Sequence, residues 1–543
     1  MRFTLPPGQL LLLALAVCGS LAYGYRDGQP SRLVEKEINF PLVSDSLSDT
    51  PLIDPPKRIA GYFKLNRTHD ARMFYFYFQS RSSPQTDPVV LWMTGGPGCS
   101  SEIAIFFENG PYSINNDTRT LSETKYGWDK HHNMIFVDQP IGTGFSYSED
   151  SRDTVFDEEV VGNDMLDFLY EFYRAHPEVL DNDFFVTGES YAGHYVPAVS
   201  NAIYRANELG TGPLTLPLRG LAIGNGLTHP SLQFPAYADF ALDNGLISQG
   251  LHDSIQWWMP LCTWGADFCD NHGWRLACVL ALQVCQLTSF QRILAANPRI
   301  NVYDITKTCE GALCYDMSAA DAFLNRPSTR RELGVDEGRG WAECDMTVNG
   351  NFMGDWLRSY SRLLPALLED GIRVMVYAGD LDLICNWVGN QRWVDALEWD
   401  QSEQWPSVEP VEWRVAAGEQ PAGTVRQLGP LSFVRVYQAG HMVPMDQPRA
   451  ALDLITRFTR GKTLAEEQQQ VEQAEAGVLQ QGYVKEVVAG ARKRQETYRR
   501  DKYPEEGVKE AGAGAGDVVK LALGRHGVRE QQQQRGGEEV AAA

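Results

Sequence analysis

The chain has 543 residues, of which 43% are hydrophobic and 22% are charged, and its formal net charge is −22 at pH 7. This is the composition of a globular protein, and so acidic a surface, with no basic stripe in the body, argues against a nucleic-acid-binding role. The tail from Gly461 carries nearly equal numbers of acidic and basic side chains, so the acidity belongs to the globular part. It is compatible with an acidic compartment.

An apolar run stands close to the amino terminus. It covers residues 10–17 and is followed by small residues. The run is too short to span a bilayer and has the proportions of a signal peptide, which we place at 1–24, although a buried strand is the alternative. No membrane span is expected after it. We therefore expect a protein of the secretory pathway, in a vacuole- or lysosome-like compartment or extracellular. Residues 25–56 are polar and are predicted to be an extended arm or propeptide.

Short apolar runs of strand length follow one another from Ile59 onward. They cover residues 59–65, 71–80, 89–94, 134–138, 184–186, 220–225, 374–380 and 433–440. Apolar residues repeat at helical spacing over 161–172, and again after Gly193. Strands that alternate with helices predict a doubly wound α/β sheet, in which ligand sites lie at the carboxyl ends of the strands.

The run Phe184–Gly193, FFVTGESYAG, is the centre of this prediction. A short buried strand stops at Gly188 and a helical pattern follows Gly193, so Ser190 is expected on a sharp turn between strand and helix. Such a nucleophile elbow exposes the serine hydroxyl at a helix N-terminus. The usual pattern is G-x-S-x-G, and Ala192 takes the second small position here.

A serine hydroxyl becomes a good nucleophile only when a base takes its proton and an acid orients that base. In α/β-hydrolases the chain order is serine, acid, histidine. His441 stands out as the base, because it follows a predicted strand at a glycine turn late in the chain. The run GDLDLICNW offers both Asp380 and Asp382 as the acid, and spacing alone does not choose between them.

The stretch from about 227 to 346 departs from the strand rhythm, is rich in Trp and Cys, and is predicted to be a helical cap over the site. Six cysteines between Cys262 and Cys314 have the density of a disulfide framework. A zinc site is the competing interpretation, but these spacings lack the tight cysteine pairs that zinc favours. Residues 461–543 are of low complexity and are predicted to be disordered, which leaves 57–460 as the catalytic domain.

Five sequence blocks carry a family resemblance. WMTGGPGCSS, VDQPIGTGFSYS, GESYAGHYVP, GDLDLICNW and GHMVPMDQP resemble, in order and spacing, the signature blocks of serine carboxypeptidases of the carboxypeptidase Y and cathepsin A type, plant relatives included. The resemblance implies an α/β-hydrolase fold, with a mixed, mostly parallel sheet, helices on both faces and a helical, disulfide-stapled cap. It also implies release of C-terminal amino acids from peptides and proteins, favoured at acid pH, without cofactor or metal.

The same resemblance assigns roles to individual residues. It implies Ser190 as the nucleophile, His441 as the base and Asp382 as the acid. The backbone N–H groups of Gly96 and Tyr191 would form the oxyanion hole. Backbone donors explain the glycine-rich WMTGGPG turn, because a bulky side chain there would block the approach to the oxyanion.

An exopeptidase must also recognise the free carboxylate of its substrate. The resemblance implies that Glu189 and Glu108 do this as a hydrogen-bonded pair, together with Thr94 and Gly95. Two close carboxyl groups share a proton, and the protonated one donates to the substrate. The family usually has asparagine where this chain has Thr94, whose hydroxyl also donates but with a shorter reach.

The cysteines fit the same template. Of the ten in the chain, one lies in the predicted signal, and the odd remainder requires at least one free or intermolecular thiol. By resemblance the pairs are Cys99 with Cys344, Cys262 with Cys285, Cys269 with Cys278, and Cys309 with Cys314, with Cys385 left as a free thiol near the site. Asn66 and Asn116 begin N-glycosylation sequons. A monomer or a homodimer is expected.

Two other functions compete with peptide hydrolysis. Some plant relatives use the same triad to transfer an acyl group from a glucose ester to an alcohol. They often carry aspartate before the nucleophile, whereas Glu189 here keeps the peptidase form. A non-enzymatic, protective or chaperone-like role with an unused triad is the second alternative, and the presence of Ser190, Asp382 and His441 together argues against it.

Overall fold

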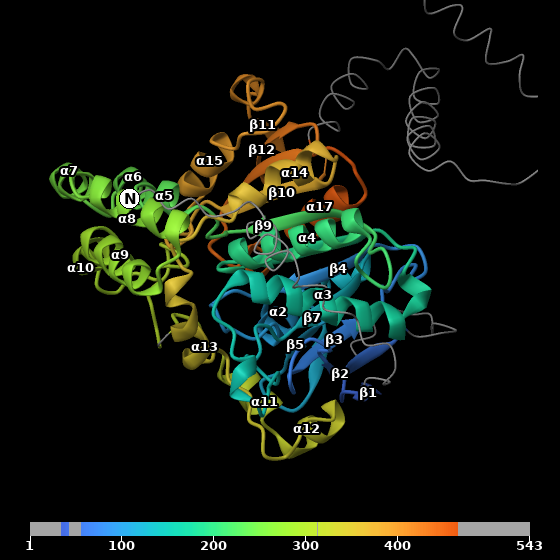
Figure 1. Ribbon diagram of the computed structural model, residues 1–543. Helices are drawn as coiled ribbons and strands as arrows, with labels where there is room; N and C mark the ends of the chain where they lie inside the picture. Colours follow the sequence, from blue (N-terminus) through green and yellow to red (C-terminus); the bar gives the residue numbers. More distant parts are fainter. Residues whose placement is uncertain (1–33, 43–55, 312, 417, 465–543) are drawn as a thin grey trace, which may run out of the picture. The chain divides into compact units, whose positions relative to one another are not determined.

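The computed structural model describes residues 34–42, 56–311, 313–416 and 418–464 (Figure 1). The predicted signal peptide and nearly all of the predicted tail lie outside the described residues. Of the predicted arm, β1 (Val34–Glu37) is described, and it pairs antiparallel with β2 (Arg58–Lys64). This piece of the arm is therefore extended, as expected, and forms one edge of the sheet.

Eleven strands form one mixed sheet, which confirms the expected α/β class. From β1 and β2 the order continues through β3 (Arg72–Phe78), β7 (Asn133–Val137), β4 (Val89–Met93), β8 (Phe184–Glu189), β9 (Leu218–Gly224), β10 (Arg373–Gly379), β13 (Leu431–Val436), β12 (Gly423–Leu428) and β11 (Val411–Trp413). The six strands from β7 to β13 in this order are parallel, and the flanking strands are antiparallel. β5 (Tyr112–Ile114) and β6 (Leu121–Glu123) form a separate small sheet.

The central strands are apolar without alternation because both faces of the sheet are covered. Every residue of β4, β7 and β8 is buried. Successive side chains point to opposite faces, so Leu91 and Met93 join one hydrophobic cluster while Val90 and Trp92 join another. The sheet thus lies between two apolar layers, as a doubly wound fold requires.

In each of the two apolar layers, side chains from helices pack against those of the strands. The first cluster includes residues of α3 (Glu158–Ala175), α4 (Ala192–Leu209), α14 (Leu364–Glu369) and α15 (Trp387–Asp395), and the second includes residues of α2 (Glu102–Phe107) and α17 (Pro448–Thr459). α3 contains the segment predicted to be helical, and its first turn is capped by Asp157, whose carboxylate accepts the Val160 N–H at 3.1 Å. The predicted helix after Gly193 is α4.

A helical insertion, residues 225–372, separates β9 from β10 (Figure 1). Besides α14, its α-helices are α5 (Pro230–Gln233), α6 (Ala236–Asp243), α7 (Gln249–Gln256), α8 (Met259–His272), α9 (Arg275–Thr288), α10 (Phe290–Ala296), α11 (Ser318–Leu324), α12 (Pro327–Leu333) and α13 (Met346–Asn351). Disulfides from Cys262 to Cys285 and from Cys269 to Cys278 join α8 to α9 inside a third hydrophobic cluster. Cys99 is bonded to Cys344 and Cys309 to Cys314, the pairs that the resemblance implies.

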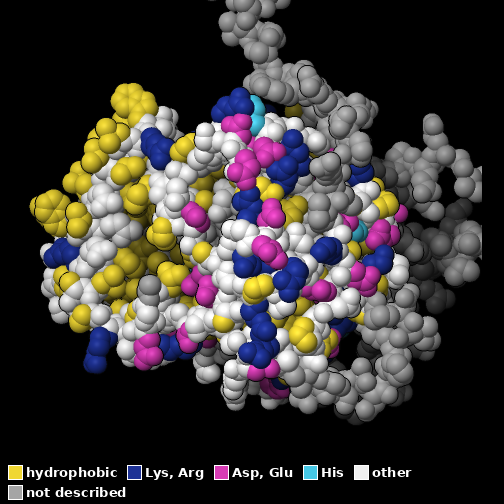
Figure 2. Space-filling model, turned by 90° about the horizontal axis from the view of Figure 1, so that it is seen from below, with side chains coloured by type: hydrophobic (Ala, Val, Ile, Leu, Met, Phe, Trp, Pro, Cys, Tyr) yellow, Lys and Arg dark blue, Asp and Glu magenta, His cyan; other side chains and the backbone are white. Residues whose placement is uncertain are grey.

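Part of the helical insertion is unusually apolar on its surface. Trp257 is 80% exposed and Leu276 is 75% exposed, and Figure 2 shows hydrophobic side chains gathered on this side of the molecule. Within the described residues, the segment Arg275–Ala296 is long and apolar enough for a membrane span by length and composition alone, with mean hydropathy 1.3. Disulfides bond Cys278 and Cys285 of this segment to α8. The exposed apolar side chains and the hydropathy therefore do not by themselves indicate a membrane span.

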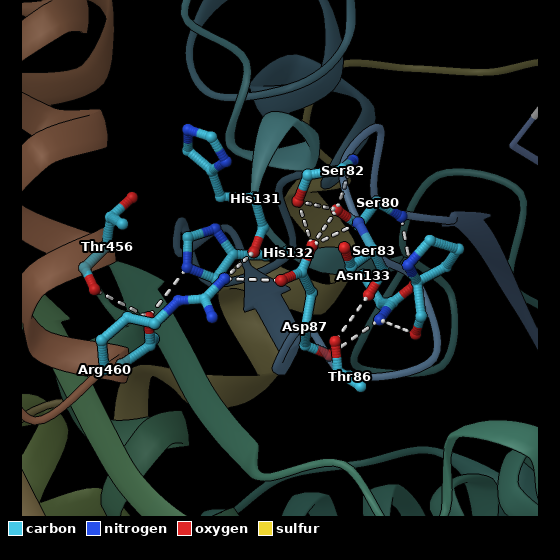
Figure 3. Close-up of polar contacts among 12 residues, drawn as sticks. Ser80, Ser82, Ser83, Thr86, Asp87, His131, His132, Asn133, Thr456 and Arg460 are labelled. Atoms are coloured by element: carbon cyan, nitrogen blue, oxygen red, sulfur yellow. Dashed lines mark hydrogen bonds and ion pairs between the residues drawn. The ribbon is translucent and has the colours of Figure 1, made fainter. Parts of the chain in front are cut away.

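A polar cluster around Asp87 connects the end of α17 to the segment just before β4 (Figure 3). It lies at the amino-terminal ends of the parallel strands, and the candidate site lies at their carboxyl ends. Asp87 is buried, and its carboxylate accepts hydrogen bonds from Ser80 Oγ at 2.5 Å, Ser83 N at 2.9 Å and Arg460 Nη2 at 2.5 Å, and another from Ser82 Oγ. Burial opposes ionisation, but these donors hold the pKa of Asp87 below its usual range.

We expect Asp87→Ala to lower the free energy of unfolding by about 3 kcal/mol, because several donors lose a charged acceptor at once. Urea denaturation at pH 7 measures the change, and Asp181→Ala, at an exposed position, is the control. Since the pKa is lower in the folded state, the contribution of Asp87 should be complete above about pH 4 and decline as the pH falls further. A stability difference that did not shrink in acid would contradict this origin.

Candidate active site

Ser190 lies on the turn between β8 and α4 that the sequence predicts. Its φ is 68°, a left-handed conformation that is uncommon for residues other than glycine and is typical of a strained functional turn. Its N–H donates to the Gly224 carbonyl at 3.1 Å, and its carbonyl accepts the Leu227 N–H at 2.9 Å. A Cβ at Gly188 would lie only 2.5 Å from the Met93 carbonyl oxygen, so this position of the elbow needs glycine.

His441 and Asp382 meet at the same edge of the sheet. His441 follows β13, Asp382 follows β10, and His441 Nδ1 lies 2.8 Å from Asp382 Oδ2. Both side chains are buried. The His441 loop is supported by Tyr303, whose carbonyl accepts the His441 N–H at 2.7 Å and whose ring centroid lies 5.1 Å from the imidazole. Because β8, β9, β10 and β13 are adjacent, Ser190 lies at the same carboxyl edge.

Three further donors hold Asp382. Its Oδ2 accepts the Asn225 side-chain amide at 2.8 Å and the Cys385 N–H at 3.3 Å, and its Oδ1 accepts the Ile384 N–H at 3.0 Å. Asn225 also accepts the Gly379 N–H at 3.1 Å and has a φ of 39°. Sequence reasoning missed Asn225, although its place at the end of the run GLAIGN, beside a predicted strand end, was a usable signal.

Asp380 lies in a different environment. Its carboxylate accepts the Gln438 N–H at 2.8 Å and lies 3.6 Å from Arg435 Nη2. Spacing left both aspartates open as the acid, and the structure brings Asp382 to His441.

The glycine-rich turn after β4 packs directly against the elbow. A Cβ added to Gly95 would lie 2.4 Å from the Tyr191 nitrogen and 2.8 Å from Ser190 Cβ. Gly96 has a φ of 108°, and a Cβ there would lie 2.7 Å from the Cys99 nitrogen. Larger residues would force this turn away from the Tyr191 N–H.

Glu189 and Glu108 bring two buried carboxyl groups together beside Ser190. Glu189 ends β8, Glu108 follows α2, and the two side chains lie within hydrogen-bonding reach. Two ionised carboxylates only repel each other, so the contact becomes a hydrogen bond when one is protonated. Among the described residues, both oxygens of Glu108 and Oε2 of Glu189 lack any other donor. Burial raises the pKa of Glu108 to about 7, and burial and then repulsion from Glu108 raise the pKa of Glu189 well above its usual range.

Thr94 directly precedes Gly95, and Cys385 lies three residues after Asp382, whose Oδ2 accepts the Cys385 N–H. The Thr94 hydroxyl accepts the Trp92 Nε1–H at 3.1 Å and keeps its own proton to donate. Cys385 is a free thiol, and burial raises its pKa well above the usual range, so it stays neutral and is a poor nucleophile. Asn66 and Asn116 are both exposed, as glycosylation requires. In the described part of the chain, the structure shows no metal-binding group of three or more His, Cys, Asp or Glu residues.

The mixed sheet, the strained serine elbow and the His–Asp contact at its carboxyl edge define an α/β-hydrolase. The chain belongs to the serine carboxypeptidase family and is a hydrolase of that family, since the family model described as "Serine carboxypeptidase" matches residues 51–461. This confirms the resemblance found in the five sequence blocks.

Named relatives agree with the family match. Serine carboxypeptidase 3 of Hordeum vulgare is 46% identical over 439 residues, covering 81% of this chain and 84% of that protein. Serine carboxypeptidase-like 48 of Arabidopsis thaliana is 45% identical over 434 residues, covering 79% and 84%. Among solved structures, Kex1(delta)p, a prohormone-processing carboxypeptidase from Saccharomyces cerevisiae, is 26% identical with a TM-score of 0.67, covering 78% of this chain and 95% of that chain.

Proposed function

We propose that this protein releases single amino acids from the C-termini of peptides and proteins through an acyl-enzyme on Ser190. The observation that carries the proposal is the 2.8 Å contact between His441 and Asp382 at the edge where Ser190 lies on its elbow. Asp382, held by three donors, fixes the imidazole with Nδ1 protonated and leaves Nε2 free to act as a base.

Catalysis then follows the usual order of acyl transfer. Ser190 Oγ attacks the last peptide carbonyl while His441 takes the hydroxyl proton, and the backbone N–H groups of Gly96 and Tyr191 stabilise the oxyanion. Collapse of the intermediate breaks the C–N bond, and His441 returns the proton to the departing amino acid. Water, activated by His441, hydrolyses the ester and restores Ser190.

The Glu108–Glu189 pair makes the enzyme an exopeptidase in this proposal. With one proton between them, the pair donates a hydrogen bond to the substrate carboxylate, assisted by Gly95 and Thr94. With no proton, two negative charges face a third. Because the pKa of both carboxyls is raised, the pair holds a proton throughout the acid range and loses it only as the pH rises further, so binding of a free C-terminus is strongest in acid.

We expect the KM of a peptide with a free C-terminal carboxylate to rise about tenfold or more between pH 5 and pH 8. The reason is that deprotonation of the pair removes the donor and adds a repelling charge. Initial rates across this range measure KM and kcat separately. The same peptide with an amidated C-terminus carries no charge there and should show a much flatter KM profile.

Glu108→Gln combined with Glu189→Gln is the matched variant, because it keeps shape and hydrogen-bonding groups but cannot ionise. It should flatten the profile of the free acid. Equal profiles for acid and amide would show that the pair does not bind the carboxylate. An unchanged slope in the double variant would assign the proton to another group.

Acyl transfer from a glucose ester is the alternative outcome, because plant serine carboxypeptidase-like proteins are among the relatives. Product analysis with a blocked dipeptide and a glucose ester offered side by side separates the two activities. The disulfides favour an oxidising compartment. We propose the secretory pathway, ending in a vacuole- or lysosome-like compartment or outside the cell, with peptide C-termini as the partners of a monomer or homodimer.

A further inference from the structure

The side chain of Tyr191, the residue after the proposed nucleophile, is buried in a polar contact that the chemistry above does not use. Its hydroxyl donates to Asp355 Oδ2 at 3.1 Å. The hydroxyl of Tyr360 donates to the other oxygen, Asp355 Oδ1, at 2.8 Å. Asp355 is itself only 2% exposed, so both phenols are bound to one buried carboxylate.

The Tyr191 ring is held as firmly as its hydroxyl. It stacks on the His194 ring with centroids 4.5 Å apart and planes inclined by 16°, and it lies 5.1 Å from the Trp356 ring and 6.1 Å from the Phe352 ring. Burial lowers the pKa of His194 to about 3, so the imidazole is neutral, and its Nδ1–H donates to the Leu227 carbonyl at 2.6 Å. The tyrosine therefore has one available orientation.

This orientation matters because the backbone of Tyr191 belongs to the elbow. Tyr191 is the N-cap residue of α4, and its nitrogen lies against the Gly95 turn. The N–H and the side chain are joined through one Cα, so the contacts that anchor the phenol and the ring oppose a shift of the Tyr191 backbone. A displacement of about 1 Å at such a group costs on the order of a hundredfold in rate.

The charge around Asp355 suits this role. Burial raises the pKa of Asp355 to about 6, so it is ionised at neutral pH and largely protonated at pH 5, and its two oxygens accept from the two phenols. Arg358 Nη1, 3.5 Å from Oδ1, partly compensates the buried charge. Asp157 also faces it, as does Glu158, and burial raises the pKa of Glu158 well above its usual range and thus keeps it neutral.

Asp355 belongs to the end of the helical insertion rather than to the sheet. The next residues are fixed to α8, because Asp270 accepts the Ser359 N–H at 2.9 Å and Arg362 Nη1 at 2.7 Å. A continuous set of contacts thus runs from α8 through residues 355–362 to the elbow.

We propose that Asp355 is a positioning residue, which holds the Tyr191 backbone N–H at the oxyanion through the Tyr191 phenol and links the helical insertion to catalysis. The inference rests on the proposed function, because it assigns Tyr191 to the oxyanion hole. It predicts that loss of the Asp355 contact weakens stabilisation of the transition state and leaves substrate binding unchanged.

Tyr191→Phe tests this with a minimal change, since it removes only the hydroxyl. We expect kcat to fall about tenfold with KM within twofold of the parent, and a peptide aldehyde that forms a hemiacetal with Ser190 to bind about tenfold more weakly. Asp355→Asn should act on the same parameters. The double variant should lose little more than the worse single variant, because both remove one interaction.

Tyr204→Phe is the matched control. Tyr204 lies on the same helix, and its hydroxyl donates to Asp370 Oδ2 at 2.9 Å, but this pair lies near the other end of α4. It should leave kcat and aldehyde binding unchanged. Circular dichroism and thermal melting show whether the Asp355→Asn variant folds. If that variant does not fold, Tyr191→Phe alone decides the question, because it removes only a hydroxyl.

The outcomes separate the inference from the proposed function. An active parent with an unchanged kcat in Tyr191→Phe overturns the inference alone, as does a loss confined to KM or full additivity in the double variant. A parent that neither cleaves peptides nor binds the aldehyde overturns both. A tenfold loss in kcat and in aldehyde affinity, absent from Tyr204→Phe, supports it.

Discussion

Replacing Ser190 by alanine is expected to lower kcat for a peptide substrate by about a million-fold, with the fold unchanged. No other described side chain at the elbow replaces the hydroxyl, since the nearby Cys385 thiol is buried and neutral. The strained φ of 68° costs alanine about what it costs serine, so stability should change little.

Steady-state kinetics measures the loss, and an organophosphate that labels the active serine gives a second readout. The parent should be labelled once and Ser190→Ala not at all. Ser200→Ala, at a buried serine on the same helix α4, is the control and should keep both labelling and kcat. Full peptidase activity in a correctly folded Ser190→Ala variant would show that another residue is the nucleophile.

The second large effect concerns Asp382, the proposed acid that orients His441. Asp382→Asn should lower kcat by about 10⁴-fold, because an amide offers the imidazole no charge and favours the wrong tautomer. The 2.8 Å contact is between His441 Nδ1 and Asp382 Oδ2, and Asn225 donates to that same oxygen. Asn225→Ala should therefore lower kcat as well, but less, since it removes one of several donors to Asp382.

Asp380→Asn is the natural control for Asp382→Asn. The two aspartates are two residues apart on one loop, yet Asp380 accepts from the Gln438 N–H and faces Arg435. Its replacement should change kcat only a few-fold. A greater loss from Asp380→Asn than from Asp382→Asn would reverse the assignment of the acid.

The strand-and-helix alternation was predictable from sequence because buried strands and amphipathic helices leave local patterns. The runs at 89–94 and 184–186 became β4 and β8, and the helical spacing over 161–172 became part of α3. Ser190 was predictable for a similar reason, since its strand–turn–helix setting is local. The edge strand β11 and its neighbour β12 went unrecognised, because their exposed and half-buried residues have no continuous apolar run.

Contacts between distant parts of the chain were not predictable in this way. The choice between Asp380 and Asp382 depends on how the loop after β10 turns toward His441, which spacing does not determine. Asn225 and Asp355 gain their roles from partners 157 and 164 residues away, Asp382 and Tyr191 respectively. The Glu108–Glu189 pair was reached through family resemblance, because two single glutamates carry no local signal.

The most direct test of the proposed function follows one peptide by mass spectrometry at pH 5, with its C-terminus free in one sample and amidated in the other. The parent enzyme should shorten the free peptide by successive single residues from its C-terminus, and Ser190→Ala should leave it intact. Internal cleavage, removal of residues from the amino terminus, or equal shortening by Ser190→Ala would contradict a carboxypeptidase that acts through Ser190.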